Sequence, residues 1–100
     1  MSVKNEEILA QNAHSAEQLL KQMANKNRLM VLCTLMDQEL SVGELNQRVP
    51  LSQSALSQHL TVLRDAGLVA TRRESQTIHY RINDPRVGKI LDALYSIFCE

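Results

Sequence analysis

The sequence contains few aromatic residues and little glycine or proline. Its 100 residues include no tryptophan and three aromatic side chains, Tyr80, Tyr95 and Phe98. There are three glycines and two prolines, and no repeat or flexible linker interrupts the chain. The core must therefore consist of Leu, Val, Ile and Met, which suits packed helices better than a β-sandwich. A chain of this length predicts one domain, spanning residues 1–100.

Long apolar runs are also missing. The first seven residues contain no apolar signal-peptide core, and no run approaches the length needed to cross a bilayer. We therefore expect a cytoplasmic protein without a membrane partner. The two cysteines, Cys33 and Cys99, would then lie in a reducing compartment, where a permanent structural disulfide is not expected.

The charge is balanced overall but unevenly distributed. The formal net charge is zero, and residues 48–81 carry a net charge of +3 because five of the arginines lie there. The segments before and after this one are both slightly acidic. This distribution permits a nucleic-acid partner but does not require one.

Apolar residues recur at three- and four-residue spacing in the first half of the chain, as in helices that bury one face. A first helix is expected over residues 6–24, with this spacing at Leu9, Ala13, Ala16, Leu20 and Met23. A second helix is expected over residues 27–36, and its apolar stripe is Leu29, Leu32, Cys33 and Met36. Ser41 is a good N-cap for a short third helix, with Glu44 at the capping-box position and Pro50 at the end.

The second half of the chain predicts a fourth helix, a hairpin and a fifth helix. Ser52 caps a helix over residues 52–66 that Gly67 closes, with Leu56, Leu60 and Leu63 inward. Alternating apolar residues then predict strands over 68–73 and 77–82, joined by a turn at 74–76. Pro85 begins a last helix whose apolar stripe is Leu91, Leu94, Tyr95 and Phe98. The predicted fold is mainly α (α+β): a winged helix-turn-helix of five helices with a two-stranded β-hairpin as the wing.

The fourth helix has an unusual outward face. No charged residue occurs from Ser52 to Leu63, although an ordinary solvated helix would carry Lys and Glu there. Amides and hydroxyls are the groups that pair with base edges in the major groove. The predicted base-reading residues are Gln53, Ser54, Ser57 and Gln58.

Three further residues are candidates for contacts with the DNA backbone. Arg72 and Arg73 lie beside the tip of the predicted hairpin, where they could contact phosphates, although charged hairpin turns are common without any partner. His59 lies late in the fourth helix and could contact phosphate or pack half-buried. These arginines and the uncharged helix favour double-stranded DNA as the partner over a winged helix that binds other proteins.

The segment Leu51-Ser52-Gln53-Ser54-Ala55-Leu56-Ser57-Gln58-His59-Leu60, with Leu63-Arg64 and Ala66-Gly67-Leu68-Val69 after it, resembles the recognition region of the ArsR/SmtB family of bacterial repressors. The resemblance extends over nearly the whole chain. It implies a homodimer joined through the first and last helices, with a pseudo-palindromic operator and an inducer that weakens DNA binding. The apolar residues predicted for those two helices exceed what one small core covers, which also favours a dimer.

The metal sites of that family are not retained. The stretch that matches the family's thiolate site is Glu39-Leu40-Ser41-Val42-Gly43-Glu44-Leu45, which has no cysteine. The positions that match its second site are Asp84, Arg86, Ile97 and Glu100, which include no histidine. Zn²⁺ needs several converging N or S ligands, so we expect no metal and no other cofactor. No catalytic motif is present either, so we expect no enzymatic activity.

Cys33 and Cys99 remain as the candidate sensor. Together with Leu32, the Leu40–Leu45 stretch and Tyr95, they resemble the HlyU/BigR/SqrR branch of the family. That branch is associated with sensing oxidants or reactive sulfur through two cysteines, one on the second helix and one near the end of the last. The alternative is that both cysteines are small packing residues. The sequence also leaves open whether the protein represses directly or activates by displacing another repressor.

Overall fold

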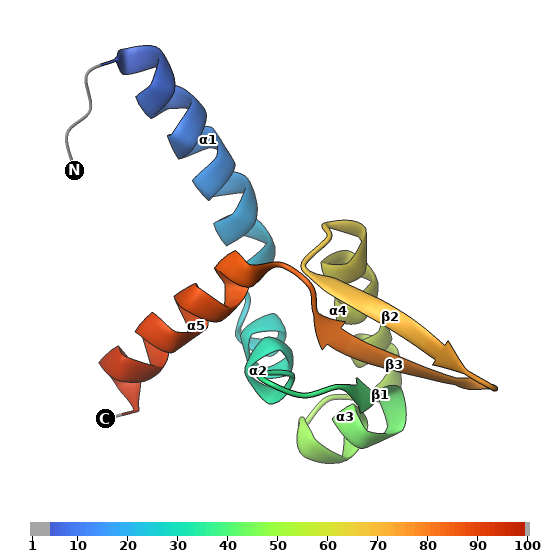
Figure 1. The fold of residues 1–100 in the computed structure, drawn as a ribbon. Helices are drawn as coiled ribbons and strands as arrows, with labels where there is room; N and C mark the ends of the chain where they lie inside the picture. Colours follow the sequence, from blue (N-terminus) through green and yellow to red (C-terminus); the bar gives the residue numbers. More distant parts are fainter. Residues whose placement is uncertain (1–4, 100) are drawn as a thin grey trace.

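Figure 1 shows the computed structural model, which describes residues 5–99. The helices and strands of this part alternate along the chain in the order of a winged helix-turn-helix. They are α1 (Glu6–Met23), α2 (Lys26–Thr34), β1 (Leu40–Ser41), α3 (Val42–Arg48), α4 (Gln53–Asp65), β2 (Val69–Glu74), β3 (Thr77–Ile82) and α5 (Pro85–Phe98). The predicted five helices and hairpin are confirmed, with boundaries shifted by one or two residues.

The sheet contains one strand more than predicted. β2 and β3 form the antiparallel hairpin, and β1 pairs with the other edge of β3, which gives the order β1-β3-β2. Leu40 lies opposite Tyr80 and Ser41 opposite His79. A strand of two residues is too short to produce an alternating pattern, so β1 could not be predicted from residue spacing. β1 nevertheless joins the base of the wing to the start of α3.

The helix starts follow the predicted capping chemistry. Ser41 accepts a hydrogen bond from the Glu44 N–H at 3.1 Å, and the Glu44 carboxylate accepts one from the Ser41 N–H at 2.9 Å. This is a complete capping box. Asp84 caps α5 by accepting from the Arg86 N–H at 2.9 Å, and Pro85 is the first residue of that helix. Gly67 follows α4 with φ of +78°, the left-handed conformation that glycine adopts without strain.

The core lies between α2, α3, α4 and the inner face of the sheet. The predicted α4 stripe is confirmed, since Leu56, Leu60 and Leu63 are fully buried. Leu45 and Val49 of the α3 region are also buried, as predicted. The other buried side chains of this core are Leu19, Met23, Val31, Leu32, Leu35, Leu40, Leu68, Val69, Tyr80, Val87 and Leu91. The helix-turn-helix and the wing are therefore held by one continuous apolar cluster.

α1 and α5 extend outward from this body in different directions (Figure 1). The radius of gyration is 15.3 Å, which exceeds the value of about 13 Å expected for a compact chain of this length. Leu19 and Met23 are the buried residues of α1, whereas Leu9 and Leu20, which belong to the apolar surface that favours a dimer, are about half exposed in the single chain. No helix among residues 5–99 is long and apolar enough to cross a membrane.

Candidate nucleic-acid interface and thiol pair

The helix-turn-helix consists of α3, a three-residue connection at 49–51, and α4 capped by Ser52. The Asn46 side chain donates to the Leu51 carbonyl oxygen at 2.9 Å, which fixes the connection to α3. Ser52 Oγ accepts from the Ala55 N–H at 3.1 Å and satisfies a free donor of the first turn of α4. These two hydrogen bonds fix the start of α4 relative to α3.

The outward face of α4 is exposed and uncharged. Gln53, Ser54, Ser57 and Gln58 are all exposed, as the prediction of base contacts requires. His59 is half-buried, so both of its predicted roles stay open. The Thr61 hydroxyl donates to the Ser57 carbonyl oxygen at 2.9 Å, which leaves it less free than the amides to reach a partner.

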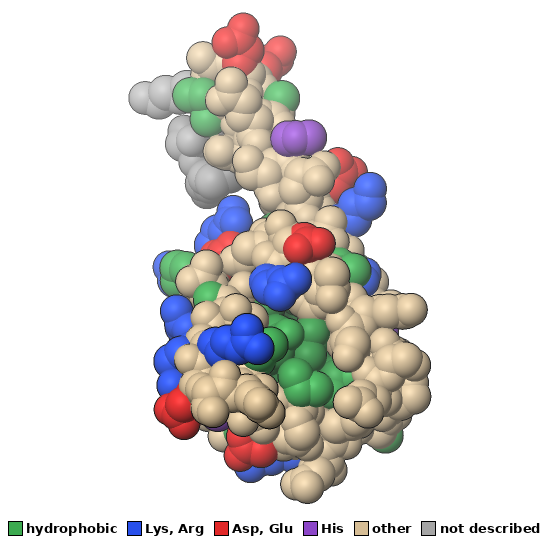
Figure 2. All heavy atoms as spheres, turned by 90° about the vertical axis from the view of Figure 1, so that its right-hand side faces the viewer, with side chains coloured by type: hydrophobic (Ala, Val, Ile, Leu, Met, Phe, Trp, Pro, Cys, Tyr) green, Lys and Arg blue, Asp and Glu red, His purple; other side chains and the backbone are tan. Residues whose placement is uncertain are grey.

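The wing and α4 border a shared groove. Its lining includes Gln53 of α4, the turn residue Gln76 and Ile78 of β3. Figure 2 shows the molecule from the side toward which β2 and β3 point in Figure 1, with a hollowed apolar area and Lys and Arg side chains gathered on one side of it. Uncharged side chains and backbone occupy the other side (Figure 2). Asp and Glu side chains lie beside some of these Lys and Arg side chains (Figure 2).

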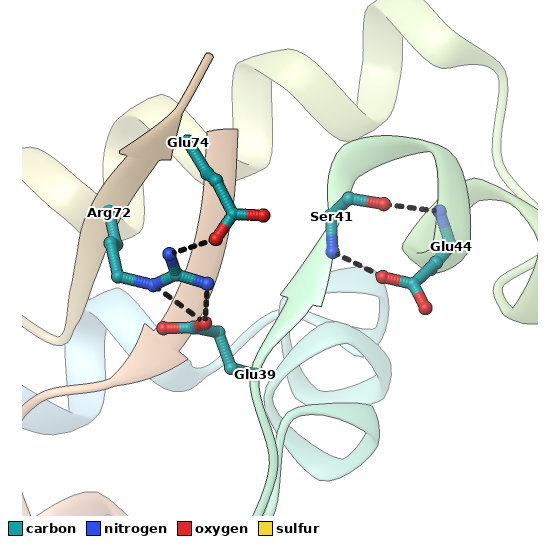
Figure 3. A network of polar contacts seen from close by, with 5 residues as sticks. All are labelled: Glu39, Ser41, Glu44, Arg72 and Glu74. Carbon is teal, nitrogen blue, oxygen red and sulfur yellow. Dashed lines mark hydrogen bonds and ion pairs between the residues drawn. The ribbon is translucent and has the colours of Figure 1, made fainter. Parts of the chain in front are cut away.

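The two wing arginines point to opposite faces of the sheet. Arg73 lies opposite Ile78, on the face that packs toward the core and the groove, whereas Arg72 lies opposite His79 on the outer face. Arg72 is engaged there by two carboxylates (Figure 3). Its Nε and Nη2 donate to Glu39 Oε1 at 2.9 and 2.6 Å, and its Nη1 donates to Glu74 Oε2 at 2.9 Å.

These contacts change the electrostatics of the outer face. The hydrogen bonds to Glu39 and Glu74 raise the pKa of the Arg72 guanidinium. The hydrogen bond from Arg72 lowers the pKa of both Glu39 and Glu74, so both carboxylates are ionised at neutral pH. Glu39 could not be predicted as a partner of Arg72, because 33 positions separate the two residues and only the folded sheet brings them together.

Cys33 and Cys99 lie on the wall of one apolar pocket between α2 and α5. The pocket has a volume of about 250 Å³, and its remaining lining is Leu29, Leu91, Leu94, Tyr95 and Phe98. Both cysteines are free and exposed in the single chain. Burial of the thiol, and secondarily the charge of Cys99, raise the pKa of Cys33. The structure therefore brings together two residues that lie 66 positions apart in the sequence.

Within residues 5–99, no group of three or more His, Cys, Asp or Glu side chains is placed to hold a metal ion. Glu100, one of the positions considered for a family metal site, lies outside the described residues. The candidate functional groups on these residues are the uncharged face of α4, the wing and the thiol pair.

The fold and this face define a DNA-binding transcriptional regulator, and known proteins support that class. Residues 25–71 match the bacterial regulatory proteins of the arsR family. The chain is 49% identical over 96 residues to the transcriptional activator HlyU of Vibrio cholerae, covering 96% of this chain and 89% of that protein. It is 43% identical over 93 residues to the biofilm growth-associated repressor of Xylella fastidiosa, covering 93% and 82%.

A solved structure agrees with this assignment. The crystal structure of the transcriptional repressor BigR from Xylella fastidiosa matches with a TM-score of 0.88 at 42% identity, covering 96% of this chain and 98% of that one. The chain therefore belongs to the ArsR family of bacterial regulatory proteins. Its relatives regulate transcription and are not enzymes.

Proposed function

We propose that this chain acts as a homodimer that represses transcription from a pseudo-palindromic operator and releases it when Cys33 and Cys99 become covalently joined. The observation that carries the proposal is the convergence of these two thiols on one apolar pocket between α2 and α5. A pair of packing residues would be expected inside the core, whereas both cysteines are exposed in the single chain.

DNA binding is assigned to α4 and the wing. In a two-fold dimer the two α4 helices would enter successive major grooves, with half-sites roughly 10 base pairs apart. Gln53 and Gln58 can pair with adenine edges, and Ser54 and Ser57 with several base edges. Arg73, exposed beside the groove, is the wing residue assigned to a phosphate.

The dimer is assigned to α1 and α5. Leu20 is 48% exposed, and Phe98 near the end of α5 is 78% exposed. Ile8 and Leu9 of α1 and Tyr95 and Ile97 of α5 are exposed as well. Large exposed apolar areas are uncommon on a monomer, so a second copy is expected to cover the apolar faces of both helices. Leu91, predicted to lie at this interface, is instead buried in the core of the single chain.

The switch chemistry needs two thiols and an electron acceptor. With hydrogen peroxide, the two thiols give a disulfide, and the peroxide is reduced to two molecules of water. With a persulfide donor, one cysteine accepts the terminal sulfur and the donor leaves as a thiol. The second cysteine then attacks the inner sulfur of that cysteine persulfide and releases hydrogen sulfide. Both routes end in the same Cys33–Cys99 bond.

The order of attack follows from the environment of Cys33. Its pKa is raised because its sulfur is partly desolvated, so at neutral pH it remains largely a thiol. We therefore assign the first attack to Cys99 and the closing step to Cys33. The closing step should accelerate as the pH rises through the raised pKa of Cys33, because the thiolate is the reactive form.

Release of DNA follows from where the bond is made. α2 carries Cys33 and contacts both α3 and α4, while α5 carries the exposed apolar residues of the dimer surface. A bond between α2 and α5 would therefore change how each helix-turn-helix is oriented relative to the dimer axis. Typical allosteric coupling energies of about 1–3 kcal/mol correspond to roughly 5- to 150-fold weaker operator binding.

The experiment is intact-mass analysis after treatment of the reduced protein with a mild oxidant or a persulfide donor. Wild type should lose two hydrogens within one chain and regain them on reduction. Cys33→Ser should accumulate a modified Cys99, and Cys99→Ser should react slowly. If wild type forms no bond within the chain, the cysteines are packing residues and the switch is wrong.

A second candidate is that DNA binding activates transcription by displacing another repressor. The name of the Vibrio cholerae relative, a transcriptional activator, favours this outcome for some operators. The two candidates use the same α4 face and differ in where the operator lies. A transcription assay on the upstream DNA, with and without the protein, distinguishes them by the sign of the effect.

A further inference from the structure

Arg72 and Arg73 are neighbours in the sequence, yet the sheet gives them different surroundings. Arg73 lies on the face of β2 that carries Ile78 opposite it, and Ile78 lines the groove that Gln53 of α4 also lines. Arg72 lies on the other face, opposite His79. Only Arg73 is therefore placed on the side of the wing that α4 shares.

The guanidinium of Arg72 is also already occupied. All three of its nitrogens donate to carboxylates, two to Glu39 and one to Glu74, at 2.6 to 2.9 Å. The three side chains together carry a net charge of −1 at neutral pH. A phosphate that replaced either carboxylate would approach the other one, so this cluster is a poor anion site.

The partner Glu39 belongs to a different part of the molecule. It immediately precedes β1, in the segment that links α2 to α3, whereas Arg72 is on β2 at the far side of the sheet. The ion pair therefore spans β3 and connects the wing to the start of the helix-turn-helix (Figure 3). Glu74 is on β2 with Arg72, so its contact remains within the hairpin.

We infer that Glu39 is a positioning residue for the wing, which acts through Arg72 and holds the hairpin at the angle that brings Arg73 to the DNA backbone. This inference rests on the proposed DNA binding. It assigns to Arg72 a role inside the protein in place of a phosphate contact.

The test is titration of the upstream DNA with wild type and variants at several salt concentrations. Glu39→Gln removes the ion pair between Arg72 and Glu39. Glu74→Gln is the matched control, because it removes the same charge from within the hairpin. If this ion pair positions the wing, Glu39→Gln weakens DNA binding roughly two- to fivefold, the range expected for loss of one exposed ion pair. Glu74→Gln should bind as well as wild type or better, because it removes a negative charge near DNA.

Variants of Arg72 provide the second comparison. Arg72→Gln should weaken binding about as much as Glu39→Gln, and the double variant should be no weaker than either single one. Arg72→Lys should behave like Arg72→Gln, because an ammonium cannot reproduce the three-nitrogen contact. A phosphate contact would instead leave Arg72→Lys near wild type and lower the salt slope of Arg72→Gln by about one.

Glu39→Asp tests whether the length of the side chain matters when its charge is kept. It keeps the charge but is one methylene shorter, so a positioning role predicts weaker binding and a purely electrostatic role predicts no change. Thermal midpoints are measured for every variant. If wild type binds and Glu39→Gln binds equally or more tightly, the inference is wrong although the proposed function stands. If wild type itself does not bind its upstream DNA, both are wrong.

Discussion

The central body and the two outer helices draw on the same leucine-rich composition and use it in opposite ways. In the body, Leu45, Leu56 and Leu63 have no exposed surface, and all three leucines of α4 belong to the core cluster. On α1 and α5, Leu20 and Phe98 remain largely exposed. The body therefore holds the fold together, and the exposed faces of the outer helices are where we expect a second copy to associate.

The largest expected effect is a core deletion in the body. Leu60→Ala removes a fully buried side chain from the α4 stripe and should lower the free energy of unfolding by about 2–5 kcal/mol. Chemical denaturation measures it. A loss well below this range would show that the body relies on contacts other than this stripe.

The matching change on the outer helices should leave the fold intact. Phe98→Glu should weaken dimerisation roughly 30-fold, which corresponds to the loss of about 2 kcal/mol at an interface hot spot. Ser96→Glu, at an exposed polar position of α5, adds the same charge as a control. Sedimentation equilibrium gives the dimer constant. Unchanged dimerisation of Phe98→Glu would place the interface elsewhere.

The two parts of the DNA surface should also respond differently. Gln58→Ala should cost about 1–3 kcal/mol at particular base pairs and relax specificity there. Arg73→Gln should weaken binding to all sequences and lower the salt slope by about one. Competition titrations with single-base operator variants measure both. Uniform losses for both variants would contradict the assignment of base reading to α4.

The smallest effect is expected at the cap of α4. Ser52→Ala removes the acceptor for the Ala55 N–H and should cost about 1 kcal/mol of stability. Ser57→Ala, a hydroxyl deletion inside the same helix, should be neutral or slightly stabilising because alanine has the higher helix propensity. Equal losses for both would show that the cap contributes nothing specific.

Local chemistry explains which elements the sequence could predict. Ser41 with Glu44, Asp84 with Pro85, and Gly67 each act over a few residues, so the helix ends near them were predicted closely. The inward face of α4 was also predictable, because only one of its faces is apolar.

Features that depend on distant partners were not predictable in the same way. The ion pair between Arg72 and Glu39 and the strand β1 form only when the sheet forms. On α1 the periodicity predicted a helix, yet apolar residues on a helix that meets a second chain follow the same spacing as those facing a core. Residue spacing therefore does not say whether Leu9 and Leu20 face this chain or a second copy.

The most direct test of the account compares operator binding by the reduced wild-type dimer and by the same protein after Cys33 and Cys99 have been joined. We expect the protein with the Cys33–Cys99 bond to bind the operator roughly 5- to 150-fold more weakly. Reduction should restore binding, and Cys33→Ser should keep its affinity after the same treatment. Full-affinity binding by protein whose mass confirms the bond would contradict the account.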